Sequence, residues 1–368
     1  VATRMSFNFA ISSSYFMEIA KFRAARLLWA KMVEVYNPAS AKSSQMRIHA
    51  ETSRWNKTVY DAYVNMLRTT TEGMSAVLAG VDSLTVLPFD APYAESSIFS
   101  ERIARNQQLL LREESYLGQV ADPSAGSYYI ENLTISIAEN AWNQFLKIDE
   151  MGGYKESFVN GYVQAQIAEV SNKRDANIAN RRETVLGTNQ YPNFNEIADA
   201  KAVSADAVTR KASEKPADAI ALPLVPYRGA QAFEALRYRT DVSGRRPKVF
   251  MLTLGGLAMR RARAQFSCNF FAVAGFEVID NLGFKTVDEG VKAALDAKSD
   301  IVVICSSDEE YATLAVEAFE KLNGKAIYVV AGDPACKPEL EAKGIKNYIN
   351  VKSNLLETLK GYQNLLNI

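Results

Sequence analysis

The stretch KVFMLTLGGLAMRRARAQFSCNFFAVAGFEVID, at residues 248–280, decides the fold of the C-terminal third of this chain. It begins with a short apolar and β-branched run, passes through a glycine pair into a helical pattern, and ends in a second apolar run. This order is typical of two parallel strands joined by a crossover helix. The stretch therefore predicts an α/β fold.

The same alternation continues to the end of the chain. Within it, the helical stretch at 309–322 carries an apolar stripe at spacings of three and four residues, which indicates core packing rather than a cofactor site. Five strand–helix units predict a doubly wound, five-stranded parallel sheet. The predicted strands are residues 248–254, 276–281, 300–305, 326–330 and 347–351.

Three further strands are predicted in the N-terminal part, at residues 5–11, 46–52 and 83–87, and long helical patterns separate them. This is the alternation of a parallel sheet or barrel, but three strands cannot close a barrel. Residues 172–241 are rich in Ala, Asn, Lys, Arg and Glu and contain a proline-bearing run, so we expect an exposed helical connector there. The predicted parts are a domain at 1–170, a connector at 171–245 and a domain at 246–368.

Charge and composition exclude several classes of function. The 368 residues contain 42 basic and 42 acidic side chains, so no net field attracts nucleic acid or an anionic membrane. A transmembrane stretch of roughly 20 apolar residues and a signal-peptide pattern are both missing, so a cytoplasmic protein is expected. The isolated cysteines Cys268, Cys305 and Cys336 suit buried thiols and lack metal-ligand spacing. His49 is the only histidine, which narrows acid–base and metal chemistry sharply.

Five ordered motifs stand out in the N-terminal part of the chain: RMSFNFAISSSYFMEIAKFRAAR (4–26), MRIHAETS (46–53), LRTTTEGMSAVLAGVDSL (67–84), ERIARNQQLLLREES (101–115) and VADPSAGSYYIENLT (120–134). Two more, RRPKVFMLTL and AGFEV, follow the connector. Together these motifs resemble the methylmalonyl-CoA mutase family, and the resemblance covers most of the chain.

The resemblance implies the C-terminal part of a CoA-threading (β/α)₈ TIM-type barrel, followed by a flavodoxin-like cobalamin domain. The chain resembles the family from near the sixth barrel strand onward. The family segment that carries the active-site histidine, in a YHMQEAG-like sequence, has no counterpart here. We therefore expect either a fragment of a longer subunit or a barrel that another chain completes.

Cobalamin domains of this family hold the cofactor through a DxHxxG motif, whose histidine replaces the lower ligand of cobalt. Counting back from the matched GFEV sequence, these positions are Ala258, Arg260 and Arg263. The guanidinium of Arg260 offers cobalt no lone pair, and Arg263 adds bulk where the glycine leaves room. The family's Ser-x-Leu and Gly-Gly motifs survive only as Ser306 and Gly332. The resemblance thus implies degenerate cobalamin positions and no cofactor bound by this chain.

Two other motifs allow a functional and a structural interpretation. Gly255 and Gly256 follow a strand and precede a helix, as in a phosphate-cradling turn, although a tight structural turn is the simpler interpretation. His49 matches a family histidine near the CoA tail, but Glu51 and Arg54 follow it and do not make a coherent pyrophosphate site. We interpret His49 as a structural histidine, with substrate contact as the alternative.

Three further features of the sequence are less informative about function. The barrel turn that is polar in catalytic members of the family reads Thr-Val-Leu at 85–87 here, so apolar groups replace hydrogen-bonding ones. Residues 122–131 match a family hairpin motif, which we interpret as a structural turn. The arginine pairs at 181–182 and 260–261 are expected to be solvated charges.

Three hypotheses of function follow. The first is a small, non-catalytic subunit with no catalytic residues of its own, which forms a heterodimer with a large mutase subunit. That partner would isomerise methylmalonyl-CoA and succinyl-CoA with adenosylcobalamin. The second is an active cobalamin-dependent mutase, against which Arg260 argues. The third is a module that binds a nucleotide or another small ligand at the strand ends of the C-terminal domain.

Overall fold

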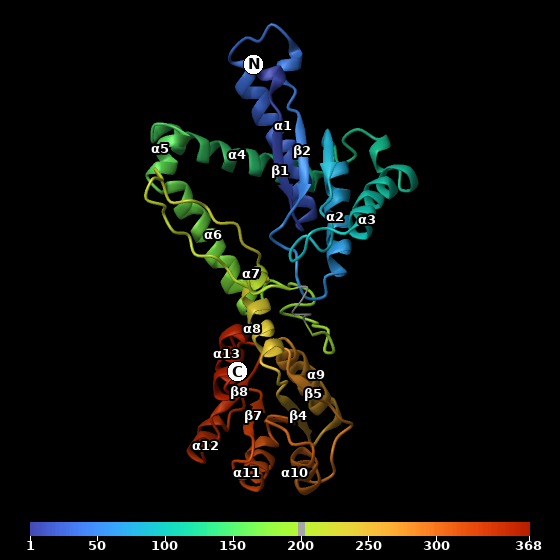
Figure 1. The fold of residues 1–368 in the computed structure, drawn as a ribbon, viewed down its shortest axis with the longest axis vertical. Coiled ribbons are helices and arrows are strands. Elements are labelled where there is room, and N and C mark those ends of the chain that lie inside the picture. The colour runs from blue at the N-terminus through green and yellow to red at the C-terminus, as the bar shows by residue number, and fades with distance from the viewer. Residues whose placement is uncertain (198–202) are drawn as a thin grey trace. The chain divides into compact units, whose positions relative to one another are not determined.

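The computed structural model describes residues 1–197 and 203–368, and the chain forms two compact units (Figure 1). The first unit contains Val1–Asn172 and Arg210–Gly229, and the second contains Lys173–Thr209 and Ala230–Ile368. The chain therefore passes from one unit to the other three times. Helix α6 (Tyr162–Ala179) begins in the first unit and ends in the second.

The first unit is built on a parallel sheet with the strand order β1-β2-β3. β1 (Phe7–Ile11) pairs with β2 (Ile48–Thr52), and β2 pairs with β3 (Ser83–Thr85). Parallel strands need long crossover connections, which α1 (Tyr15–Glu34) and α2 (Val64–Leu78) provide. The three strands predicted in the N-terminal part are confirmed, each slightly shorter than expected.

The remaining elements of the first unit are mostly helical. The core lies where β1, β2, α1 and α2 pack together, and α4 adds Ile130 to it. Alternate residues of β2 point into this core, with Ile48, Ala50 and Thr52 buried. The remaining elements are η1 (Ala2–Arg4), η2 (Ala41–Ser44), α3 (Ile98–Leu109), η3 (Leu110–Glu114), η4 (Leu117–Gln119), α4 (Tyr128–Glu150) and α5 (Tyr154–Val159).

The second unit contains a five-stranded parallel sheet in the order β5-β4-β6-β7-β8. Numbered from its first strand, this is the order 2-1-3-4-5. Successive strands are added on one side of β4 first and then on the other, so the strand order reverses between β4 and β6. The five strands predicted for the C-terminal third are confirmed, and no end differs by more than two residues. They are β4 (Lys248–Thr253), β5 (Glu277–Ile279), β6 (Ile301–Cys305), β7 (Ile327–Ala331) and β8 (Asn347–Ile349).

Helices cover both faces of this sheet. Phe250 and Leu252 of β4 pack in one cluster with residues of α10 and α11. Val249 and Met251, which alternate with them, are buried on the opposite face, where α9 contacts β4 to β7. The predicted helix at 309–322 is confirmed as α11 (Tyr311–Leu322). The other helices are α7 (Ala205–Val208), α8 (Gln231–Val242), α9 (Leu257–Ala272), α10 (Val287–Asp296), α12 (Lys337–Ala342) and α13 (Leu355–Leu365).

The structure departs from the sequence predictions in the stretch at 172–241, which was expected to be an exposed helical connector. In its described part it is helical only in the end of α6, in α7 and in α8, and Asn189 and Phe233 within it are buried. Residues 198–202 of that stretch lie outside the described residues. The structural turn expected at 122–131 is present, and it leads directly into the helix α4.

No helix in the described ranges is long and apolar enough to cross a membrane. In the same ranges, no group of three or more His, Cys, Asp or Glu side chains is placed to hold a metal ion.

Candidate functional site

In a doubly wound sheet, ligands bind in the crevice at the carboxyl ends of the strands, next to the point where the strand order reverses. In the second unit, this edge is formed by the residues that follow β4, β6 and β7. It contains Gly255, Ser306 and Gly332, and the first turns of α9 reach over it. The candidate site is therefore this edge, which we call the strand-end crevice.

The glycine turn after β4 is occupied by a carboxylate of the chain itself. Gly255 has a φ of +71°, and a Cβ at this position would collide with the side chain of Glu310. The Glu310 carboxylate accepts hydrogen bonds from the Ser306 hydroxyl, the Ser307 backbone N–H and the Gly256 backbone N–H. The Ser306 hydrogen bond, followed by the backbone N–H groups, lowers the pKa of Glu310. An internal anion thus sits where a phosphate-cradling turn would hold its ligand.

Arg260 bridges two loops at the same edge. Its guanidinium donates to the carbonyl oxygens of Gly255 and Leu282, each at 3.1 Å. A Cβ at Gly283, whose φ is +113°, would lie 2.6 Å from the Arg260 Cζ. The side chain therefore fills the space that Gly283 leaves, and the expectation of a solvated charge is wrong for Arg260.

Arg263 lies at the far side of the crevice, where it lines a hollow of about 420 Å³. Its guanidinium donates to the Ala331 carbonyl oxygen and forms an ion pair of 2.7 Å with Asp308. A Cβ at Gly332, whose φ is +151°, would collide with this guanidinium. Three glycines of the crevice are thus covered by Glu310, Arg260 and Arg263. Ala258 lies exposed in the first turn of α9, while Ser306 is fully buried.

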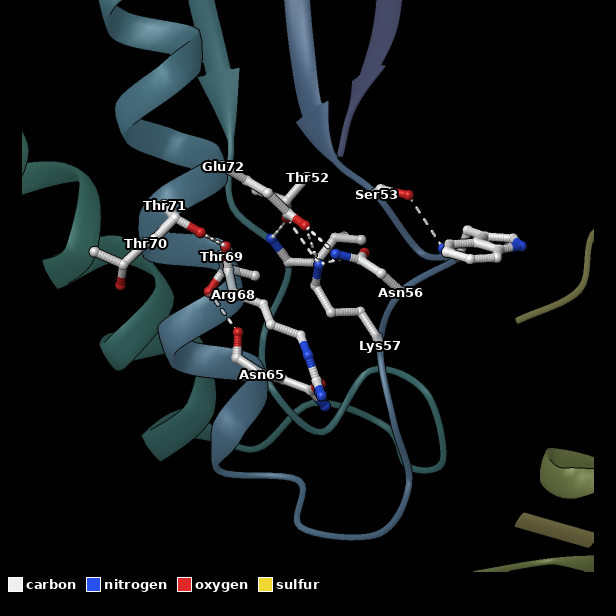
Figure 2. A network of polar contacts seen from close by, with 12 residues as sticks. Thr52, Ser53, Asn56, Lys57, Asn65, Arg68, Thr69, Thr70, Thr71 and Glu72 are labelled. Carbon is white, nitrogen blue, oxygen red and sulfur yellow. Dashed lines mark hydrogen bonds and ion pairs between the residues drawn. The ribbon is translucent and has the colours of Figure 1, made fainter. Parts of the chain in front are cut away.

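The first unit has a buried polar network after the carboxyl end of β2 (Figure 2). The Lys57 ammonium lies 2.8 Å from both carboxylate oxygens of Glu72, and Asn56 donates to the same carboxylate at 2.6 Å. The side chains of Lys57 and Glu72 are 4% and 0% exposed. Arg228 donates to the Lys57 carbonyl oxygen at 3.1 Å, which ties the returning segment to this network.

The ionisation of this pair is set by two opposed effects. Burial lowers the pKa of Lys57 and raises the pKa of Glu72, and the attraction between the two groups opposes both shifts. Because Glu72 binds through both oxygens and water is excluded, the pair stabilises the loop and offers no free proton acceptor. Sequence reasoning missed it, since no motif spacing joins Lys57 to Glu72.

His49 is held on both sides of its ring. Its Nδ1 lies 2.7 Å from the Ser83 hydroxyl and its Nε2 lies 3.2 Å from the Thr85 hydroxyl, both on the neighbouring strand β3. Glu51 and Arg54 pair with each other at 3.4 Å on the surface. These contacts give His49 a role in joining β2 to β3.

The turn at 122–131 is held by an arginine from the first motif of the chain. Arg23 of α1 donates to Asp122 and to Glu131, and Glu131 also accepts from the Gly126 backbone N–H at 2.9 Å. The hydrogen bond from Arg23 lowers the pKa of Glu131. The turn therefore joins α1 to the start of α4.

Arg181 also differs from the prediction of a solvated charge. Its guanidinium lies over the rings of Phe266 and Phe270, at 4.7 and 5.3 Å, and burial lowers its pKa. The cysteines are free, and burial raises the pKa of the Cys268 thiol to about 12 and that of Cys305 further. Both thiols are therefore poor nucleophiles.

Comparison with known proteins agrees with the sequence motifs. The family model described as "Methylmalonyl-CoA mutase" matches residues 1–220. The chain is 56% identical, over its whole length, to the methylmalonyl-CoA mutase small subunit of Porphyromonas gingivalis, and covers 59% of that protein. It is 36% identical to the probable methylmalonyl-CoA mutase small subunit of Mycobacterium tuberculosis, over 97% of the chain and 57% of the relative. For the small subunit of Streptomyces virginiae the identity is 37%, over 85% of the chain and 49% of the relative.

Proposed function

The chain belongs to the methylmalonyl-CoA mutase family, and we propose from this that it acts as a non-catalytic small subunit beside a large catalytic subunit. The large subunit would isomerise methylmalonyl-CoA and succinyl-CoA with adenosylcobalamin, and the two chains would form a heterodimer. The names of the relatives from three bacteria, each a small subunit, support this role. The chain spans about 59% of the length of the Porphyromonas relative, so the activity of a whole subunit is part of the proposal.

The proposed architecture is the C-terminal part of a CoA-type barrel followed by a degenerate cobalamin domain of the flavodoxin-like kind. The strand order 2-1-3-4-5 of the second unit supports the latter, because flavodoxin-like sheets have this order. The three parallel strands of the first unit, with their crossover helices, support the former.

One observation carries the proposal most directly: the chain's own side chains occupy the glycine positions of the strand-end crevice and leave a hollow of about 420 Å³ beside Arg263. Arg260 cannot ligate cobalt because its guanidinium stays protonated and offers no lone pair. Arg263 occupies the space above Gly332, and Glu310 occupies the turn at Gly255. These residues do not fit cobalamin in the family's binding mode, so no catalytic step by this chain is proposed.

The buried Lys57–Glu72 pair supports the same proposal in the first unit. Active sites of (β/α)₈ barrels lie at the carboxyl ends of the strands, and this pair lies just after the carboxyl end of β2. A fully paired, water-free ion pair supplies stability there and leaves no group to act on a substrate.

The first test is a titration with adenosylcobalamin, followed by the absorbance change that marks displacement of the cofactor's own base. We expect no change with this chain alone and a clear change with a homologous large subunit. The two chains together should co-elute as a heterodimer in size-exclusion chromatography. Tight binding by the unaltered chain, with the spectral change, would contradict the proposal and favour an active mutase.

A variant that restores the family motif provides a second test of cobalamin binding. The triple substitution Ala258→Asp, Arg260→His and Arg263→Gly restores the family motif and removes two of the side chains that fill the crevice. We expect this variant to gain measurable cobalamin binding, while Ala258→Asp alone should not, because both arginines remain.

A further inference from the structure

A second hollow lies on the opposite side of α9 from Arg263, beside the end of β5, and its volume is about 840 Å³. This is within the range of small-molecule sites. One wall is formed by the α9 residues Leu257, Ala264 and Cys268, and a second wall by the segment after β5. The third wall is the loop that contains Tyr191 and Phe194. We call this hollow the α9–β5 slot.

The mouth of the slot exposes apolar side chains to water. Leu282 is 94% exposed and Leu257 is 60% exposed, while Tyr191 and Phe194 are 67% and 40% exposed. Large apolar side chains that gather around a hollow are typical of a binding site, since a ligand would remove them from water. An aromatic pair at the rim suits a flat, weakly polar group such as a nucleobase.

The polar groups of the slot lie where nucleotide-binding sheets place them. β5 is the second strand of the 2-1-3-4-5 order, and Asp280 follows its last residue directly. In dinucleotide-binding folds, an acidic residue about 20 positions after the glycine turn receives the ribose hydroxyls. Asp280 follows Gly256 by 24 residues, lines the slot and is exposed at its mouth.

Positive charge is available on the same side. Arg261 lines the slot and is exposed, and among the described residues it forms no hydrogen bond or ion pair. Arg260 also lines the slot, but its guanidinium already donates to the carbonyl oxygens of Gly255 and Leu282. Arg261 is therefore the cation available to a ligand in the slot.

The glycine turn limits the size of the ligand. In a dinucleotide site the pyrophosphate would bind at the N-terminus of the crossover helix, which is α9 here. The Glu310 carboxylate already occupies that turn at Gly255 and accepts from Gly256. A second phosphate would therefore meet a negative charge, while a single phosphate could reach Arg261.

We propose that the α9–β5 slot binds a ribonucleoside monophosphate. The base lies between the apolar walls near Tyr191, the ribose hydroxyls donate to Asp280, and the phosphate pairs with Arg261. This site shares Arg260 with the strand-end crevice, but its ligand contacts are Asp280 and Arg261, which the cobalamin titration does not test.

Calorimetric titration of the full chain with AMP tests the proposal. We expect AMP to bind and its 2′-deoxy analogue to bind about tenfold more weakly, because a hydrogen bond to a charged acceptor is lost. Asp280→Asn should remove this preference for ribose. Arg261→Gln should weaken AMP about tenfold and leave adenosine unchanged, whereas a folding defect would weaken both.

The control variant is Glu277→Gln, because Glu277 is exposed at the other end of β5 and does not line the slot. It should bind AMP as the unaltered chain does. Any of three results would overturn the proposal: no AMP binding at millimolar concentration, equal binding of inorganic phosphate, or much tighter binding of NAD than of AMP. The last result would show that the glycine turn accepts a second phosphate despite Glu310.

Discussion

Lys57 and Glu72 show how single residues shape the strand ends of the first unit. Both are charged types that are almost never fully buried unless they are paired. Here each is less than a twentieth exposed, and the pair is supported by Asn56. Breaking such a pair leaves an uncompensated charge in a water-free environment, which is far more costly than losing a surface pair.

We therefore expect Lys57→Met to lower the free energy of unfolding by about 3–5 kcal/mol. The double variant Lys57→Met/Glu72→Leu should recover most of this loss, because no buried charge remains. Lys31→Met is the control, since the Lys31–Glu34 pair is 71% exposed on both sides and should contribute less than about 1 kcal/mol. Urea unfolding at neutral pH measures all three variants, and an equal loss in the single and double variants would contradict the explanation.

The same variant has a predicted pH dependence. In Lys57→Met the raised pKa of Glu72 is no longer opposed by a cation, so the folded state holds a proton more tightly than the unfolded state. Stability is then highest below the ordinary value of 4.5 and is lost as the pH rises towards the folded pKa. The difference from the unaltered chain should shrink in acid, which urea unfolding between pH 4 and 7 would measure.

For Glu310 we expect the opposite dependence of folding stability on pH. Its pKa is lowered in the folded state, so its contribution to stability is present above the ordinary value of 4.5 and is lost as the pH falls through the lowered value. Glu310→Gln should therefore melt at a lower temperature than the unaltered chain at pH 7, and the two should converge in acid. Glu309→Gln, at the exposed neighbouring position, should behave as the unaltered chain does at both pH values.

At the scale of single residues, side-chain contacts were less predictable from the sequence than the strands were. It identified Arg260, Arg263, Ser306 and Gly332 as altered positions, but not that the arginines would fill the space above glycines. That filling depends on φ angles and loop paths which no residue spacing encodes. The role of Glu310 was missed for the same reason, because the carboxylate reaches back to a turn more than fifty residues earlier.

At the scale of elements, the strands were predictable from the sequence and the burial of helix α8 was not. Short β-branched runs between helical patterns have few alternatives, and all eight predicted strands are present in the structure. Helix α8 shows the opposite case. It lies in the stretch 172–241, whose Ala, Asn, Lys, Arg and Glu content and proline-bearing run predict an exposed connector, yet Phe233 and Leu236 on its inner face are buried.

Helix α8 is expected to be required for the stability of the second unit. The buried amide of Gln363 in α13 donates to the Leu236 carbonyl oxygen at 2.6 Å and to the Thr240 hydroxyl at 2.8 Å. A fragment of residues 246–368 loses both acceptors and should be less stable than a fragment of 230–368 by at least about 2 kcal/mol. Urea unfolding of the two fragments measures this difference.

The substitution Gln363→Leu provides the matched control for α8. In the shorter fragment the loss of α8 exposes the amide to water, so the substitution should have little effect on stability. In the longer fragment it removes two hydrogen bonds and should be destabilising. The same effect in both fragments would show that α8 does not act through Gln363.

At the scale of the whole molecule, the resemblance to a family predicted more than the periodicity of the sequence did. Periodicity predicted two groups of parallel strands, and the motifs predicted the family that the comparisons confirm. Neither predicted that residues 210–229 return to the first unit after the chain has entered the second. Such a return depends on long-range contacts, such as the one from Arg228 to the Lys57 carbonyl oxygen.

The chain passes between the two units three times, and this limits how recombination can exchange one unit for another. A single crossover between related genes exchanges everything on one side of one point, so it cannot replace one unit without also dividing the other. A chimaeric chain would fold only where the parental segments that the junction separates from their unit, 173–209 or 210–229, are interchangeable. Recombination within this lineage should therefore be limited by these two segments, and the exchange of one whole unit should need several junctions rather than one.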